Sequence, residues 1–160
     1  MLITNLHIEA SSYCNARCPG CPRNAYGYPL TGFFEEKHLD VIKYAGILDV
    51  YRDVKSILFC GNHGDPMMHP SIAGFCDKNG VNFTIATNGG RLETYKDLAT
   101  KNLKIVFGID GLEDTNHLYR QGVKWENVMD RAKTFIDAGG TAEWQFIKFK
   151  HNMHQVEKAR

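Results

Sequence analysis

Apolar and polar residues alternate in short segments along the chain, and this alternation predicts strands separated by helices. Five strands are predicted, at residues 2–9, 54–60, 81–87, 104–109 and 142–149. Helices are predicted at residues 35–51, 70–77, 92–99 and 125–136, with a last helix beginning near residue 152. Strands that alternate with helices are typical of an α/β domain with a parallel sheet.

Helical spacing predicts which apolar residues face the core. In the first helix the expected inward residues are Leu39, Ile42, Ala45 and Leu48. In the short helix at 70–77 they are Ile72 and Phe75. In the helix at 125–136 they are Trp125, Val128, Ala132, Phe135 and Ile136.

Composition narrows the class of protein. With 160 residues, 43% of them hydrophobic and 23% charged, the chain has the size and make-up of one globular domain. Lys and Arg number 19 against 18 for Asp and Glu, so no basic field favours a nucleic-acid partner. No segment has the length and apolar character of a membrane span, and the N-terminus lacks the features of a signal peptide.

The five cysteines carry the first chemical signal. Cys14, Cys18 and Cys21 lie on one loop after the first strand, where Pro19 and Gly20 allow tight bends. An odd number of cysteines with three clustered argues against a disulfide framework and favours a reducing cytoplasm. Thiolates are ligands for iron–sulfur clusters and for zinc, so a cluster, a structural zinc site with a fourth ligand, or three buried thiols are all open.

The spacing C-x3-C-x2-C resembles the signature of the radical S-adenosylmethionine (SAM) enzymes. The resemblance implies a 4Fe-4S cluster held by Cys14, Cys18 and Cys21, with SAM chelating the fourth iron through its amino and carboxylate groups. It implies reductive cleavage of SAM to a 5′-deoxyadenosyl radical that abstracts hydrogen from a peptide or small-molecule substrate. A reductant such as flavodoxin or ferredoxin is the implied electron donor.

The same resemblance implies a fold. Radical SAM cores are partial (β/α) barrels of six units, and the pattern here accounts for about five. We therefore expect residues 1–160 to be a radical SAM core domain that is incomplete at its C-terminal side, similar to the SPASM/twitch subgroup. In barrel-like α/β folds the functional groups gather at the carboxyl ends of the strands.

Residues 61–66, after the second strand, resemble the Gly-Gly-Glu-Pro segment of the family. The resemblance places Gly64, Asp65 and Pro66 along the methionine end of SAM. A tight turn that caps the following helix would use the same residue types, so that interpretation also stays open.

Later motifs follow in the order that the family has them. The resemblance places Asn88, Asp110 and Arg120 on the ribose and carboxylate side of SAM, and gives Asn152 a polar contact with the cofactor. An Asn-Gly turn at Asn88 and a solvated surface charge at Arg120 are the structural alternatives.

Two other functions compete with the enzyme. The first is a non-catalytic module in which the three cysteines and one histidine bind zinc, and the second is a shortened remnant that binds cluster and SAM without turnover. Cys60 and Cys76 are interpreted as buried apolar thiols.

Overall fold

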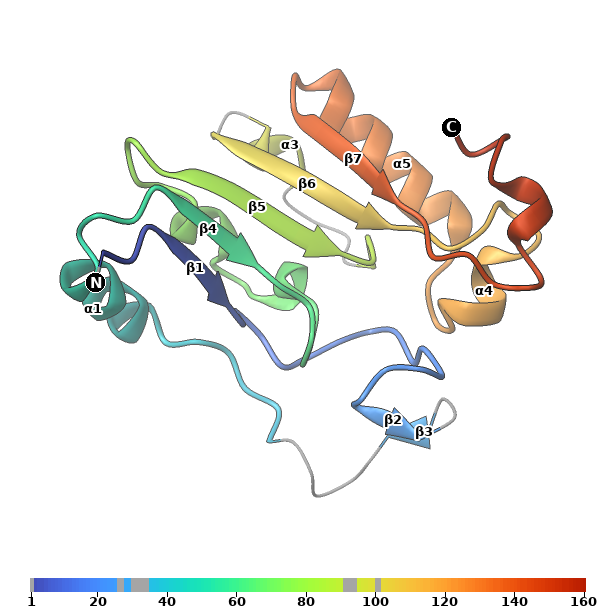
Figure 1. The fold of residues 1–160 in the computed structure, drawn as a ribbon, viewed down its shortest axis with the longest axis horizontal. Coiled ribbons are helices and arrows are strands. Elements are labelled where there is room, and N and C mark those ends of the chain that lie inside the picture. Colours follow the sequence, from blue (N-terminus) through green and yellow to red (C-terminus); the bar gives the residue numbers. More distant parts are fainter. Residues whose placement is uncertain (1, 26–27, 30–34, 91–94, 100–101) are drawn as a thin grey trace.

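Five parallel strands form one open sheet in the computed structural model, which describes residues 2–25, 28–29, 35–90, 95–99 and 102–160. The strand order is β1-β4-β5-β6-β7, so the strands follow the order of the chain (Figure 1). The sheet strands are β1 (Asn5–Ile8), β4 (Ser56–Phe59), β5 (Asn82–Thr87), β6 (Leu103–Gly108) and β7 (Thr141–Gln145). The predicted α/β class with parallel strands is confirmed.

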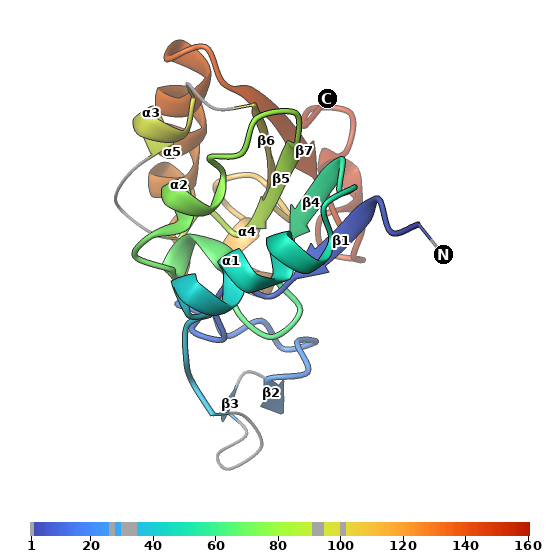
Figure 2. The ribbon, with the colours of Figure 1, turned by 90° about the vertical axis from the view of Figure 1, so that its left-hand side faces the viewer.

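Helices cover one face of this sheet (Figure 2). They are α1 (Val41–Val50), α2 (Ile72–Phe75), α3 (Tyr95–Leu98) and α5 (Trp125–Asp137). The one-turn helix α4 (Asn116–Tyr119) lies beyond the carboxyl end of β6, and 3-10 helices occupy Pro66–Met68 and Met153–Gln155. A two-stranded ribbon, β2 (Asn24–Ala25) with β3 (Tyr28–Pro29), follows the cysteine loop.

The core lies between the sheet and its helices. Alternate residues of the central strands point to this side, as the two-residue period of a strand requires. The most deeply buried of them are Ile57, Phe59, Phe83, Ile85, Ile105 and Phe107, each at most 2% exposed. Ile72 and Phe75 of α2 pack into the same core, as predicted.

The first helix begins six residues later than predicted. Its cap is Asp40, whose side chain accepts hydrogen bonds from the backbone N–H of Ile42 and Lys43. The chain just before it is extended, because Lys37 and Leu39 pair through their backbone with residues 10–12. The predicted inward face is wrong for Ile42, which is 81% exposed, and for the exposed Ala45, and Tyr44 is the buried residue of α1. Leu39 and Leu48 pack against the core, as predicted.

The last strand and last helix are shorter than predicted. β7 ends at Gln145, because the backbone N–H of Ile147 turns to the Asp110 carboxylate instead of continuing along β6. The helix expected near residue 152 is the single 3-10 turn Met153–Gln155. The helix at 125–136 is confirmed as α5, although Ile136 faces outward at 53% exposure.

We expect Asp40→Ala to lower the free energy of unfolding by about 1 kcal/mol, because two N-terminal N–H groups of α1 lose their acceptor. Asp49→Ala, on the exposed surface of the same helix, is the matched control and should change it by less than about 0.5 kcal/mol. Urea unfolding followed by circular dichroism measures both. Equal effects of the two substitutions would contradict the cap.

Candidate functional site

A cavity of about 490 Å³ lies at the carboxyl ends of the strands. It extends from the cysteine loop across the helix-free face of the sheet. Its walls include these residues that the sequence singled out: Cys14, Cys18, Cys21, Gly64, Asp65, Asn88 and Arg120. The structure therefore brings together residues that are far apart in the sequence, at the edge where parallel strands present their loops.

The cysteine loop folds so that all three thiols reach this cavity. Backbone bonds from Cys21 N to Cys18 O (3.0 Å) and from Asn24 N to Cys21 O (2.9 Å) form its turns. Arg17 N donates to Gln121 O (2.8 Å) and fixes the loop against the segment that follows α4. Cys18 is buried, whereas Cys14 and Cys21 are partly exposed.

The loop offers three thiols as metal ligands. Within the described ranges, no group of three His, Cys, Asp or Glu side chains lies close enough to hold a single metal ion. Thiolate sulfur is a ligand for iron–sulfur clusters as well as for zinc, so the chemistry of this donor set fits a cluster.

Burial and nearby charges shift the pKa values of Cys14 and Cys18. Burial raises the pKa of Cys14 to about 11, and the nearby Asp65 carboxylate adds to the rise. Burial also raises the pKa of Cys18, while a hydrogen bond and the positive charge of Arg120 oppose the rise. Because metal ligands must be thiolates, a metal bound here would displace the thiol protons.

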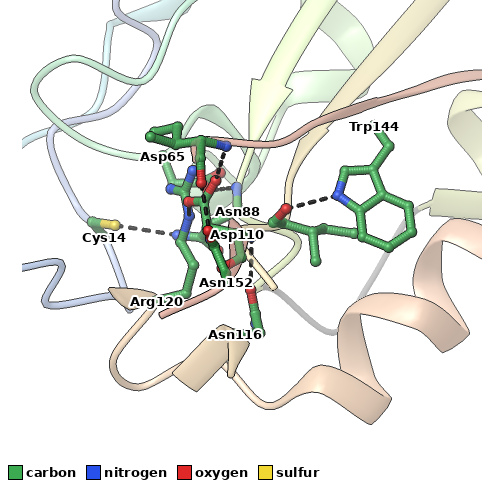
Figure 3. Close-up of polar contacts among 10 residues, drawn as sticks. Cys14, Asp65, Asn88, Asp110, Asn116, Arg120, Trp144 and Asn152 are labelled. Carbon is green, nitrogen blue, oxygen red and sulfur yellow. Dashed lines mark hydrogen bonds and ion pairs between the residues drawn. The ribbon is translucent and has the colours of Figure 1, made fainter. Parts of the chain in front are cut away.

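Asp65 connects the loop after β4 to the end of β5 (Figure 3). Its buried carboxylate accepts hydrogen bonds from Thr87 Oγ1 (2.8 and 2.9 Å), from Asn88 N (2.8 Å) and from Met67 N (2.8 Å). Burial raises the pKa of the Asp65 carboxyl, and these donors oppose the rise. Asp65 thus both caps the 3-10 helix at Pro66–Met68 and positions Asn88.

Gly64 allows the backbone to pass close to the first strand's loop. A Cβ at this position would lie 2.0 Å from Ser11 O, so the position accepts only glycine at this backbone path. Asp65 N donates to Tyr13 O (2.8 Å) beside it. Pro66 is buried as the first residue of the 3-10 helix, behind the cavity wall, where proline is well suited.

Asn88 is 5% exposed and lies between the cysteine loop and the cavity. Its Nδ2 donates to Cys14 Sγ (3.4 Å) (Figure 3), and Ala16 N donates to the same sulfur (3.4 Å). Its Oδ1 is buried without a hydrogen-bond partner. A buried acceptor of this kind is costly unless a ligand satisfies it, so this wall of the cavity fits a polar ligand.

Asp110 and Arg120 form a buried ion pair (Figure 3). Arg120 Nε donates to Asp110 Oδ2 (2.6 Å), and the side chains are 18% and 0% exposed. Burial works against the charge of Arg120, but Asp110 and Cys18 outweigh it and raise the Arg120 pKa. Arg120 packs over Gly108, where a Cβ would lie 2.5 Å from its terminal nitrogen. It is therefore a fixed cation and not a solvated surface charge.

Asp110 and Asn152 lie behind the cavity wall. Asp110 Oδ1 accepts from Ile147 N (2.7 Å), so both of its oxygens bind protein groups. Asn152 Nδ2 donates to Asp110 O (2.8 Å) and Ile147 O (2.9 Å), and its Oδ1 accepts from Phe149 N (2.7 Å). In this arrangement the two side chains hold the end of β6 and the segment after β7 together.

Several wall residues were not anticipated from the sequence. Tyr119 and Arg23 line the cavity beside the cysteines. Cys60 is buried as expected, but its thiol lies 3.1 Å from Glu9 Oε1, and burial together with Glu9 raises the Cys60 pKa to about 11. In the parallel register of β1 and β4, Ile8 lies beside Phe59, and the next residues along the two strands are Glu9 and Cys60. Aligning the two predicted strands could therefore have indicated this pair.

The fold and the site together define an α/β domain with a cavity at the strand ends that three cysteines line. A family model described as the radical SAM superfamily matches residues 8–154. The chain belongs to this superfamily, and its open parallel sheet is the partial barrel that the family resemblance predicted. Comparison with curated proteins finds no match.

Solved structures share the fold at low sequence identity. Streptococcus suis SuiB bound to precursor peptide SuiA has a TM-score of 0.76 and 22% identity, covering 99% of this chain and 36% of its own. For anSMEcpe with bound AdoMet, the TM-score is 0.73 and the identity 18%, over 97% of this chain and 45% of the other. For TYW1 with a lysine-pyruvate adduct bound, the TM-score is 0.64 and the identity 16%, over 96% of this chain and 58% of the other. The chain thus spans between about a third and three fifths of the length of these structures.

Among the described residues, no helix combines the length and apolar character that a bilayer crossing requires.

We expect Asp110→Ala to lower the free energy of unfolding by about 3 kcal/mol or more, because Arg120 would stay buried without its partner. Glu143→Ala removes the exposed ion pair between Lys104 and Glu143, and should cost less than about 1 kcal/mol. Denaturant unfolding of both variants measures the difference. The double variant Asp110→Ala/Arg120→Met should recover part of the loss, and no recovery would argue against the ion pair as its cause.

Proposed function

We propose that this domain binds a 4Fe-4S cluster through Cys14, Cys18 and Cys21 and binds SAM beside it, as the core of a radical SAM enzyme. The single observation that carries the proposal is the convergence of the three thiols and the unpartnered Asn88 Oδ1 on one cavity. Membership of the superfamily supports it. When bound, the cluster would supply the electron that cleaves SAM to methionine and a 5′-deoxyadenosyl radical for hydrogen abstraction.

The residues around the sulfurs suit thiolate ligands. The N–H groups of Ala16 and Asn88 donate to Cys14, and Arg120 donates to Cys18. Donors of this kind stabilise sulfur that carries negative charge, and they orient it before the metal arrives.

Other wall residues suit the polar end of SAM. Asn88 Oδ1 is an acceptor for an amino group, and Gly64 lets the backbone approach a ligand closely. Arg120 uses Nε for Asp110, which leaves its terminal nitrogens for Cys18 and a ligand carboxylate. In our proposal Asp65, Asp110 and Asn152 act by positioning Asn88 and Arg120, and Pro66 by shaping the turn.

The part of the cavity that lies over the helix-free face of the sheet would receive the substrate. Its walls are the mostly uncharged residues Leu58, Cys60, Ala86, Val106, Gln145 and Ile147. A peptide or small molecule that presents an uncharged carbon group suits this lining. SuiB, which shares the fold, is bound to a precursor peptide, and this supports a peptide as one candidate.

The redox setting follows from the same thiols. A one-electron donor protein such as flavodoxin or ferredoxin would reduce the cluster, and the partly exposed Cys14 and Cys21 leave that side of the loop near the surface. All five cysteines, which lie among the described residues, are reduced thiols, and this fits the reducing cytoplasm that we propose as the location.

After anaerobic reconstitution with iron and sulfide, we expect the protein to bind about four irons and four sulfides per chain. With dithionite and SAM it should then form 5′-deoxyadenosine, measured by chromatography with mass spectrometry. Cys18→Ala should lose both the cluster and the product, because one of three ligands is missing.

Cys76→Ala is the matched control. Cys76 is a buried thiol that does not line the cavity, so this variant should keep the cluster and the product. Zinc binding without sulfide would support a zinc module instead. A cluster that binds SAM without forming 5′-deoxyadenosine would support a remnant without turnover.

A further inference from the structure

Tyr119 gives the cavity its one aromatic surface among the described wall residues. It is the last residue of α4, directly before Arg120, and its hydroxyl lies beside Gly20 of the cysteine loop. Burial raises the pKa of this hydroxyl, and the nearby Cys18 adds to the rise. None of the interactions described above gives this ring a function.

Two neighbours hold the ring in place. The centroid of the Phe149 ring lies 4.4 Å from that of Tyr119, with the planes tilted by 37°. The guanidinium carbon of Arg120 lies 5.7 Å from the Tyr119 centroid, within the range of a cation–π contact. Arg120 is itself fixed by Asp110, so the ring is anchored in the same network.

Gly20, between Cys18 and Cys21, leaves the space that the ring fills. A Cβ on Gly20 would lie 3.2 Å from the Tyr119 hydroxyl and 3.6 Å from its Cε2. A larger side chain at position 20 would therefore displace the tyrosine from the loop. The cysteine loop and α4 are matched to each other at this point.

We propose that Tyr119 is the surface on which the adenine of SAM stacks, and that Gly20 is small so that the ring can take this position. This inference rests on the proposed function. Adenine is a flat, largely apolar ring system, and stacking on an aromatic side chain is the favoured way for proteins to bind it without reading its edges. The rest of SAM carries charged groups, which suit Arg120 and Asn88 instead.

The direct test measures the dissociation constant of SAM for the cluster-loaded, unreduced protein by equilibrium dialysis, so no turnover is involved. We expect Tyr119→Ala to raise the Kd by roughly 10-fold or more, in the range that one base stacked on an aromatic side chain contributes. Tyr119→Phe keeps the ring and should change the Kd by less than about 2-fold. Tyr51→Ala, which removes an exposed tyrosine at the end of α1, should leave the Kd unchanged.

Methionine separates stacking from general damage to the site. It has the amino and carboxylate groups of SAM but no adenine, so its affinity should be the same in the parent protein and in Tyr119→Ala. Equal losses of SAM and methionine binding in Tyr119→Ala would overturn the proposal, as would an unchanged Kd for SAM. Iron content per chain, measured for every variant, identifies any that fail to load the cluster.

A second pair of variants tests the match with Gly20. Gly20→Leu should weaken SAM binding when Tyr119 is present, because the leucine displaces the ring. In the Tyr119→Ala background, Gly20→Leu should add little, since there is no ring left to displace. Additive effects of the two substitutions would contradict the match.

The failure of this inference differs from the failure of the proposed function. If the cluster-loaded parent protein does not bind SAM, the proposed function is wrong. If the parent binds SAM and Tyr119→Ala binds it equally well, only the role of Tyr119 is wrong.

Discussion

Two buried carboxylates hold the strand-end loops of this domain, and the site depends on them. Where parallel strands stop, backbone N–H groups lose their sheet partners and need other acceptors. Asp65 supplies an acceptor to Met67 and Asn88, and Asp110 supplies one to Ile147. Asp65 also binds the side chain of Thr87, and Asp110 binds that of Arg120. The cost of burying these charges is thereby offset by contacts that fix the cavity.

The strands could be predicted from the sequence because their signal is local. Short apolar runs end at glycine, asparagine or aspartate, and buried residues such as Ile57 and Phe83 follow the strand period. Helix α1 was predicted less well because its start depends on a distant contact. Residues 37–39 pair with residues 10–12, and no periodicity within the helix reports that pairing. The early end of β7 has a similar cause, since the Asp110 side chain takes the N–H of Ile147.

The same difference between local signals and distant contacts separates the predictable part of the site from the rest. Three cysteines within eight residues can come together whatever the rest of the chain does. Their spacing was therefore informative by itself. The resemblance to the family also brought Asn88 and Arg120 to the correct edge of the sheet. It could not show that Asp110 and Asn152 bind other protein groups, or that Tyr119 reaches Gly20. Those facts depend on how α4 and the segment after β7 pack.

The charges around the cavity suit a site with ionised sulfurs better than one with neutral thiols. Burial favours a protonated Cys14 and a protonated Cys18, and the cation of Arg120 is paired with the Asp110 carboxylate. Arg23 stands on the same wall, paired with the half-exposed Glu36, and its Nε is buried without a partner. Thiolates bound to a cluster would lie among these cations and the N–H groups of Ala16 and Asn88. Asn88 and Arg120 are already fixed by Asp65 and Asp110, so these two need little rearrangement when the sulfurs lose their protons. The buried carboxylates thus hold both the shape of the cavity and the donors that would suit the anionic cluster that we propose.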